Sequence, residues 1–306
     1  EKIVFSTSLF DLPVEDLLVS HLAKYLKLRD IFNFRCCSRY SKDVGDAMLS
    51  DLQEITLKYP IMPYNEITFR VILQACHKLR KICIDLNRSY YYFSVRLTDE
   101  AIKELLDNNS HVDEIEIDIG NSASDSTINV LSLLASNCKN FAKFTFRGYL
   151  PVLPVDGFLK VLTQHNNHLL EVNLTFAVDF CEGEAEEFFK NQHQLQRICL
   201  PPIFGAEHFT YIQYHRFTGP AFQSDKALAR TLSTIADVCK DLRYLKIQWF
   251  GIKPMLHMAL TKIVENCPKL HTINFSFNST ISDEVLSYLK LKNIQVKGIN
   301  AKDVQQ

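Results

Sequence analysis

Apolar residues recur along most of the chain in one short pattern, apolar-x-x-apolar-x-apolar. Alternation of apolar and polar residues in its second half predicts a short, half-buried strand. The pattern first occurs at Leu79, Ile82 and Ile84, and its first position recurs at Val112, Phe141, Leu169, Leu195, Leu242, Leu270 and, in a frayed last copy, Leu291. Most successive copies are about 28 residues apart, a period typical of repeat proteins.

A helix is predicted before most of these strands, because apolar residues there recur at i, i+3, i+4 and i+7. Leu228, Leu232 and Ile235 form one such stripe. Asp99 and Ser282 head two of the segments, and such side chains favour a helix start. Four of the helices end in a Cys three residues before the strand anchor, namely Cys76, Cys138, Cys239 and Cys267. A small apolar side chain suits a tight corner there.

A unit of one strand and one helix cannot bury both of its faces alone, whereas stacked copies share a continuous core. The sequence therefore predicts an α/β solenoid of about 7–8 repeats, with the strands on its concave face. An ordinary α/β domain is the alternative, but its strands and helices vary freely in length and would not keep the anchors in step.

The first 50 residues lack this period and are rich in large apolar side chains. Pro13 starts one predicted helix, since Pro is tolerated in the first turn, and Asp30 leads a second helix. The predicted organisation is a helical module at 1–50, a connector at 51–65 and a repeat domain at 66–306 that contains an aromatic-rich insertion at 201–223.

Composition and charge limit the classes of function that the chain could have. The formal net charge is −1, which favours neither nucleic acid nor a membrane surface as partner, and no apolar run is long enough to span a bilayer. The nine cysteines are odd in number and sparse, which favours reduced thiols and a cytoplasmic or nuclear location. Metal-ligand spacing, a phosphate-binding Gly loop and a nucleophile motif are all missing, so we expect no cofactor and no catalysis.

Two known families match these patterns. The repeats resemble leucine-rich repeats of the longer type, with Cys before the first Leu, although the Asn or Cys usual after the strand is missing. The amino-terminal segment resembles the F-box, in the order Leu-Pro, acidic residue, Leu pair, spaced leucines, Asp-led helix and Cys. Tyr40 stands where the family often has Trp, and His21 replaces an apolar residue. Together they resemble the F-box and leucine-rich-repeat family.

The resemblance implies a substrate-recognition subunit of a Skp–cullin–F-box (SCF) type ubiquitin ligase, which is not itself an enzyme. Its F-box would bind a Skp-type adaptor, and through it the cullin and RING subunits, while its repeats hold target proteins for ubiquitination and degradation. The residues expected to bind the adaptor are Leu12, Pro13, Glu15, Leu17, Leu18, Leu22, Leu26, Ile31, Phe34, Cys37 and Tyr40.

Target binding is expected on the concave face, where polar residues between the buried anchors point outward. These candidates are Glu114, Glu116, Asp118, Lys143, Arg147, Glu171, Asn173, Arg197, Tyr244, Lys246 and Gln248, joined by Tyr211, Tyr214 and Phe217 of the insertion. The acidic row at 114–118 would receive a basic segment, or else pair with neighbouring strands.

Three alternatives stay open. The amino-terminal module could be a cap that shields the first repeat, with or without binding a partner. The chain could be a leucine-rich-repeat scaffold for protein–protein interaction without any ligase. It could also be a thiol enzyme using Cys83 or Cys199, which would require a lowered thiol pKa.

Overall fold

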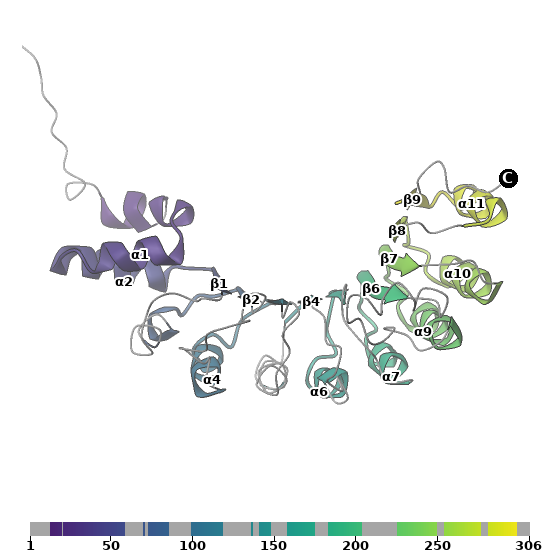
Figure 1. The fold of residues 1–306 in the computed structure, drawn as a ribbon, viewed down its shortest axis with the longest axis horizontal. Coiled ribbons are helices and arrows are strands. Elements are labelled where there is room, and N and C mark those ends of the chain that lie inside the picture. The colour runs from purple at the N-terminus through teal and green to yellow at the C-terminus, as the bar shows by residue number, and fades with distance from the viewer. Residues whose placement is uncertain are drawn as a thin grey trace, which may run out of the picture.

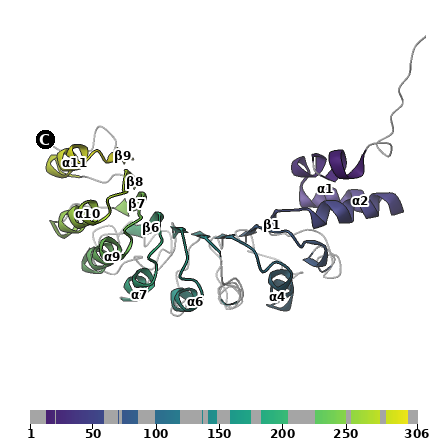
Figure 2. The ribbon, with the colours of Figure 1, turned by 180° about the vertical axis from the view of Figure 1, so that it is seen from behind.

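The computed structural model describes residues 13–19, 21–58, 70, 73–85, 99–118, 136, 141–147, 158–174, 183–203, 225–249, 254–276 and 281–298. These residues form a curved arc, with strands along its inner side and helices along its outer side (Figure 1). A group of helices lies at the amino-terminal end of the arc, and the view from behind shows the same arrangement (Figure 2).

All nine strands of the described chain belong to one parallel sheet, in which each strand pairs with the next in sequence. They are β1 (Glu54–Lys58), β2 (Lys81–Asp85), β3 (Glu114–Asp118), β4 (Lys143–Arg147), β5 (Glu171–Asn173), β6 (Arg197–Ile203), β7 (Tyr244–Trp249), β8 (Thr272–Ser276) and β9 (Gln295–Lys297). A doubly wound α/β domain instead reverses its strand order and carries helices on both faces. The sequential order therefore confirms a solenoid.

The helices of the arc follow the predicted stripes. They are α4 (Asp99–Asn108), α6 (Phe158–His165), α7 (Glu184–Lys190), α9 (Asp225–Val238), α10 (Pro254–Asn266) and α11 (Asp283–Leu291). Ser282 caps α11, because its hydroxyl accepts a hydrogen bond from the Val285 N–H at 3.4 Å. Asp99 begins α4, as its position predicts. The predicted helix ending at Cys138 lies outside the described residues.

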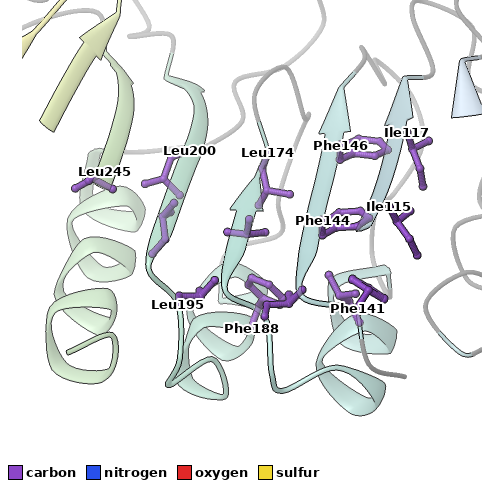
Figure 3. Packing of buried hydrophobic residues seen from close by; sticks show 14 of the residues in the cluster. Ile115, Ile117, Phe141, Phe144, Phe146, Leu174, Phe188, Leu195, Leu200 and Leu245 are labelled. Atoms are coloured by element: carbon purple, nitrogen blue, oxygen red, sulfur yellow. The ribbon is translucent and has the colours of Figure 1, made fainter. Parts of the chain in front are cut away.

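The core lies between the sheet and the outer helices. Successive strand residues point to opposite faces, so the two anchors of each strand are buried and the residues between them face the concave side. The parallel register places Ile115 of β3 beside Phe144 of β4, and Ile117 beside Phe146. Figure 3 shows these side chains stacked from strand to strand.

The strand ladder begins one unit earlier than predicted. Strand β1 lies within the range assigned to the connector, and Leu52, Ile55 and Leu57 repeat the anchor pattern there. At the other end, Ile294 is buried and β9 pairs with β8, but the predicted anchor Leu291 is 78% exposed. No further unit covers Leu291 within the described residues.

The corner between helix and strand carries a second repeating feature. The corner residue lies three positions before the anchor and is buried in six of the described copies, as Cys76, Asn109, Asn166, Gln192, Cys239 and Cys267. Asn109 Nδ2 donates to the Cys76 carbonyl at 2.8 Å, and Cys239 Sγ donates to the Gln192 carbonyl at 3.4 Å. These side chains therefore join one corner to the preceding corner along the solenoid.

The amino-terminal module consists of short helices. Its elements are the π-helical turn η2 (Val14–Val19), the 3-10 turn η3 (Leu22–Tyr25), α1 (Leu28–Arg35) and α2 (Arg39–Ser50). The N–H of Leu17 donates to the Pro13 carbonyl at 3.0 Å, so the first turn starts at the predicted proline. Helices α1 and α2 cross closely, because a Cβ at Gly45 would lie 2.8 Å from the Arg35 Cβ.

One face of this module packs on the solenoid. Leu18, Ile31 and Met48 of the module belong to the same apolar cluster as Ile55 and Leu57 of β1. Asp51, just after α2, also pairs with Lys78 at 2.8 Å. The module therefore caps the first strand–helix unit, as one of the sequence alternatives predicts.

Candidate interaction surface

The concave face carries a row of charges whose sign alternates from strand to strand. The parallel register aligns the first outward residue of each strand, in the order Glu54, Lys81, Glu114, Lys143, Glu171 and Arg197. Each of these side chains therefore has neighbours of opposite charge on the adjacent strands.

Cross-strand ion pairs join the acidic strand β3 to both of its neighbours. Lys81 Nζ lies 2.9 Å from Glu114 Oε1 and 3.5 Å from Glu116 Oε2, and Arg147 lies 3.1 Å from Glu116 Oε1. The hydrogen bond to Glu114 raises the pKa of Lys81 above its ordinary value. Lys143 pairs with Glu171 at 3.7 Å. Glu114 and Glu116 therefore pair with neighbouring strands, which was the alternative to their receiving a basic segment.

The carboxyl-terminal half of the same face has a different character. The Arg197 guanidinium lies 4.2 Å from the centre of the Tyr244 ring, and Asn274 Nδ2 donates to the Tyr244 hydroxyl at 3.1 Å. Lys246 and Lys297 follow on β7 and β9. Within the described part of the chain, Arg197, Lys246 and Lys297 form no ion pair with a carboxylate.

The predicted target-binding residues on the strands thus fall into two groups on the concave face, which differ in whether their charges are paired. Glu114, Glu116, Lys143, Arg147 and Glu171 lie in the charge-paired half. Arg197, Tyr244 and Lys246 lie in the other half. Asp118 and Asn173 also occupy concave positions of β3 and β5, and Gln248 lies in β7. Tyr211, Tyr214 and Phe217 of the insertion lie outside the described residues.

The two concave thiols are poor candidates for nucleophiles. Burial raises the pKa of Cys83 to about 12 and also raises the pKa of Cys199. A catalytic thiol needs the opposite shift, because the thiolate is the nucleophile. Among the described residues, no group of His, Cys, Asp and Glu is suited to hold a metal ion. None of the described helices is long and apolar enough to span a membrane.

Alkylation of the native chain by iodoacetamide near neutral pH tests the buried thiols. Cys36 and Cys37 are exposed and should react quickly, whereas burial raises the pKa of Cys76 and Cys83 to about 12. We expect the buried thiols to react at least about a hundredfold more slowly, measured by peptide mass spectrometry. All should react alike in urea. Equal rates in the native chain would contradict the burial described above.

The predicted adaptor-binding residues divide between the interior and the surface of the module. Leu18 and Ile31 are buried, while Leu26, Phe34 and Tyr40 are half-buried. Leu17 and Leu22 are 42% and 36% exposed, and Tyr25, which sequence reasoning had not included, is 85% exposed. Pro13 and Cys37 are also exposed. Leu12 and the side chain of Glu15 lie outside the described residues.

A single parallel sheet in sequence order, with leucine-like anchors at fixed spacing and helices on the outer side, defines a leucine-rich-repeat solenoid. This is a fold of protein–protein interaction, whose concave face is the usual binding surface. No protein-family model matches the sequence, and no curated protein matches it.

Solved structures of the same architecture are only distantly similar. LegL7, a leucine-rich repeat-containing protein from Legionella pneumophila, is 14% identical, with a TM-score of 0.48 over 92% of this chain and 84% of that chain. A chain of the yeast Rad7 and Elc1 complex is 9% identical, with a TM-score of 0.34 over 96% and 85%. A chain of the Drosophila Toll–Spatzle complex is 7% identical, with a TM-score of 0.36 over 67% and 24%. At these identities the likeness concerns the fold alone.

Proposed function

We propose that the chain is the substrate-recognition subunit of an SCF-type ubiquitin ligase. Its amino-terminal module binds a Skp-type adaptor, and its solenoid holds a target protein. The observation that carries this proposal is a group of three exposed apolar side chains within nine residues of the chain, Leu17, Leu22 and Tyr25, hereafter the apolar patch.

A capping role alone does not require this patch. The apolar core that the module shares with the first strand already buries Leu18, Ile31 and Met48. Three of the large hydrophobic side chains exposed in the described chain nevertheless gather within residues 17–25. Clustered apolar residues on a surface mark an interaction site. The patch lies in the segment that resembles an F-box, which favours an adaptor as its partner.

The proposed role is one of proximity rather than chemistry. Holding the adaptor at one end and the target on the concave face raises the effective concentration of a target lysine near the ubiquitin-loaded subunits. The chain itself then needs no catalytic group. The seven described cysteines are all free thiols, which is compatible with the proposed site of action in the cytoplasm or nucleus.

A scaffold without a ligase is the second candidate, favoured by the continuous core between module and solenoid. In that case the module would serve as a cap and would bind no adaptor. Adaptor binding separates the two functions.

The test is co-elution of the full chain with a purified Skp-type adaptor in size-exclusion chromatography, compared with the variant Leu17→Ser/Leu22→Ser/Tyr25→Ser. We expect the native chain to bind. The variant should bind at least about tenfold more weakly, because removing a desolvated hydrophobic hot spot costs about 2 kcal/mol or more.

The control is Met255→Ser/Met258→Ser, which removes two exposed apolar side chains of α10 far from the module. Both variants should keep the native far-ultraviolet circular dichroism, and the control should bind normally. A folded native chain that fails to bind the adaptor would leave the scaffold as the better account.

A further inference from the structure

We propose that the concave face of β6–β9 binds an extended segment rich in Asp and Glu, supplied by a protein partner. On the function proposed above, this partner is the target protein. This ligand has the opposite charge to the basic segment that the sequence predicted for the acidic strand β3, at the other half of the face.

The charge of the two halves carries the inference. Strands β1–β5 carry residues of both signs, and Lys81, Lys143 and Arg147 each pair with a carboxylate. Strands β6–β9 contain Arg197, Lys246 and Lys297 but no Asp or Glu. Cations that gather without carboxylates attract an anionic ligand and suppress binding of a cationic one.

The arrangement around Tyr244 holds one cation ready for a carboxylate. The ring of Tyr244 supports the Arg197 guanidinium at 4.2 Å, and Asn274 donates to the Tyr244 hydroxyl and so fixes the ring. A guanidinium held over a ring in this way presents a planar set of N–H donors, which matches the two oxygens of a carboxylate. Less side-chain entropy is then lost on binding.

Arg197 and Lys246 also lie close to each other. The register places Lys246 beside Cys199, which is two residues along β6 from Arg197. Burial raises the pKa of the Cys199 thiol, and both cations oppose this shift, so both lie near the thiol. A carboxylate between the two cations would relieve their mutual repulsion. Glu171 on β5 is the nearest acidic neighbour in register, and it pairs with Lys143.

The spacing favours an extended chain that crosses the strands. Lys246 on β7 and Lys297 on β9 are two strands apart, which corresponds to about 10 Å at the usual strand separation. A peptide in the extended polyproline II conformation rises about 3.1 Å per residue with three residues per turn, so about three residues cover the same distance and return to the same side. Acidic residues at every third position would therefore meet successive cations.

The probe is a fluorescently labelled 12-residue peptide with Glu at every third position and Gly and Ser between, titrated with the full chain at low salt while polarisation is followed. We expect Lys246→Glu/Lys297→Glu to weaken binding at least about tenfold. The control Lys103→Glu/Lys160→Glu makes the same charge change on exposed positions of the outer helices α4 and α6 and should weaken binding less than about twofold.

The proposal would be overturned by no binding of the Glu peptide, by equal loss in both variants, or by binding only of a peptide with phosphoserine in place of Glu. Binding of a Lys peptide with higher affinity than the Glu peptide would also do so. Adaptor co-elution should be unchanged in Lys246→Glu/Lys297→Glu, so failure of the acidic-segment proposal and failure of the ligase proposal give different outcomes.

Discussion

Replacement of Phe144 by Ala is expected to lower the free energy of unfolding by about 3–5 kcal/mol. Phe144 is 2% exposed and lies in register between Ile115 of β3 and Val172 of β5. Its ring centre is 5.9 Å from that of Phe141, which closes the corner below it. Truncation would leave a cavity in the middle of the solenoid, where neighbouring units stabilise one another.

Urea denaturation followed by circular dichroism measures this loss. Thr145→Ala is the matched control, because the adjacent side chain faces the concave side and is only half-buried. We expect that substitution to change the free energy of unfolding by less than about 0.5 kcal/mol. A Phe144→Ala chain within about 1 kcal/mol of the native chain would contradict the continuous core.

The second large effect is expected at the corner residue Asn109. Its Nδ2 donates to the carbonyls of Cys76 and Leu105 at 2.8 and 2.9 Å, and its Oδ1 accepts from the Leu79 N–H at 3.0 Å. Asn109→Ala would leave these buried backbone groups without partners. Each such group costs about 1–3 kcal/mol, so leaving three of them unpaired should lower the free energy of unfolding by about 3 kcal/mol or more.

Substitution by Cys tests whether the corner follows one rule along the solenoid. Cys239 occupies the equivalent corner and donates its thiol hydrogen to the preceding corner carbonyl. Asn109→Cys should therefore lose less stability than Asn109→Ala in the same urea titration. Asn108→Ala, at the exposed neighbouring position, is the control and should be nearly neutral. Equal losses for Cys and Ala would show that the carbonyl contact contributes little.

The sequence predicted the solenoid because its anchors keep a fixed spacing. Every unit must bury its strand and its helix against the neighbouring units, and this requirement repeats at the same spacing. The sequence did not predict that the corner residues join successive units, because Cys, Asn and Gln differ in chemistry and share only their position three residues before the anchor. Strand β1 was not predicted, because the helical segment before Leu52, Ile55 and Leu57 belongs to the amino-terminal module and not to a repeat.

The surfaces were harder to predict than the core. Pairing of Lys81 with Glu114 and Glu116 depends on register between strands that are far apart in sequence. In the module, Pro13 predicted the start of a helix, and Tyr25 was not among the residues expected to bind the adaptor. The structure forms the π-helical turn η2 and the 3-10 turn η3 in this segment, and Leu17, Leu22 and Tyr25 are exposed.

Amide hydrogen exchange of the full chain, with and without a saturating Skp-type adaptor, tests the central claim most directly. We expect slower exchange in residues 14–35, which include the apolar patch, and unchanged exchange in α9, α10 and α11. Slower exchange confined to the solenoid helices, or no change anywhere, would contradict adaptor binding by the amino-terminal module.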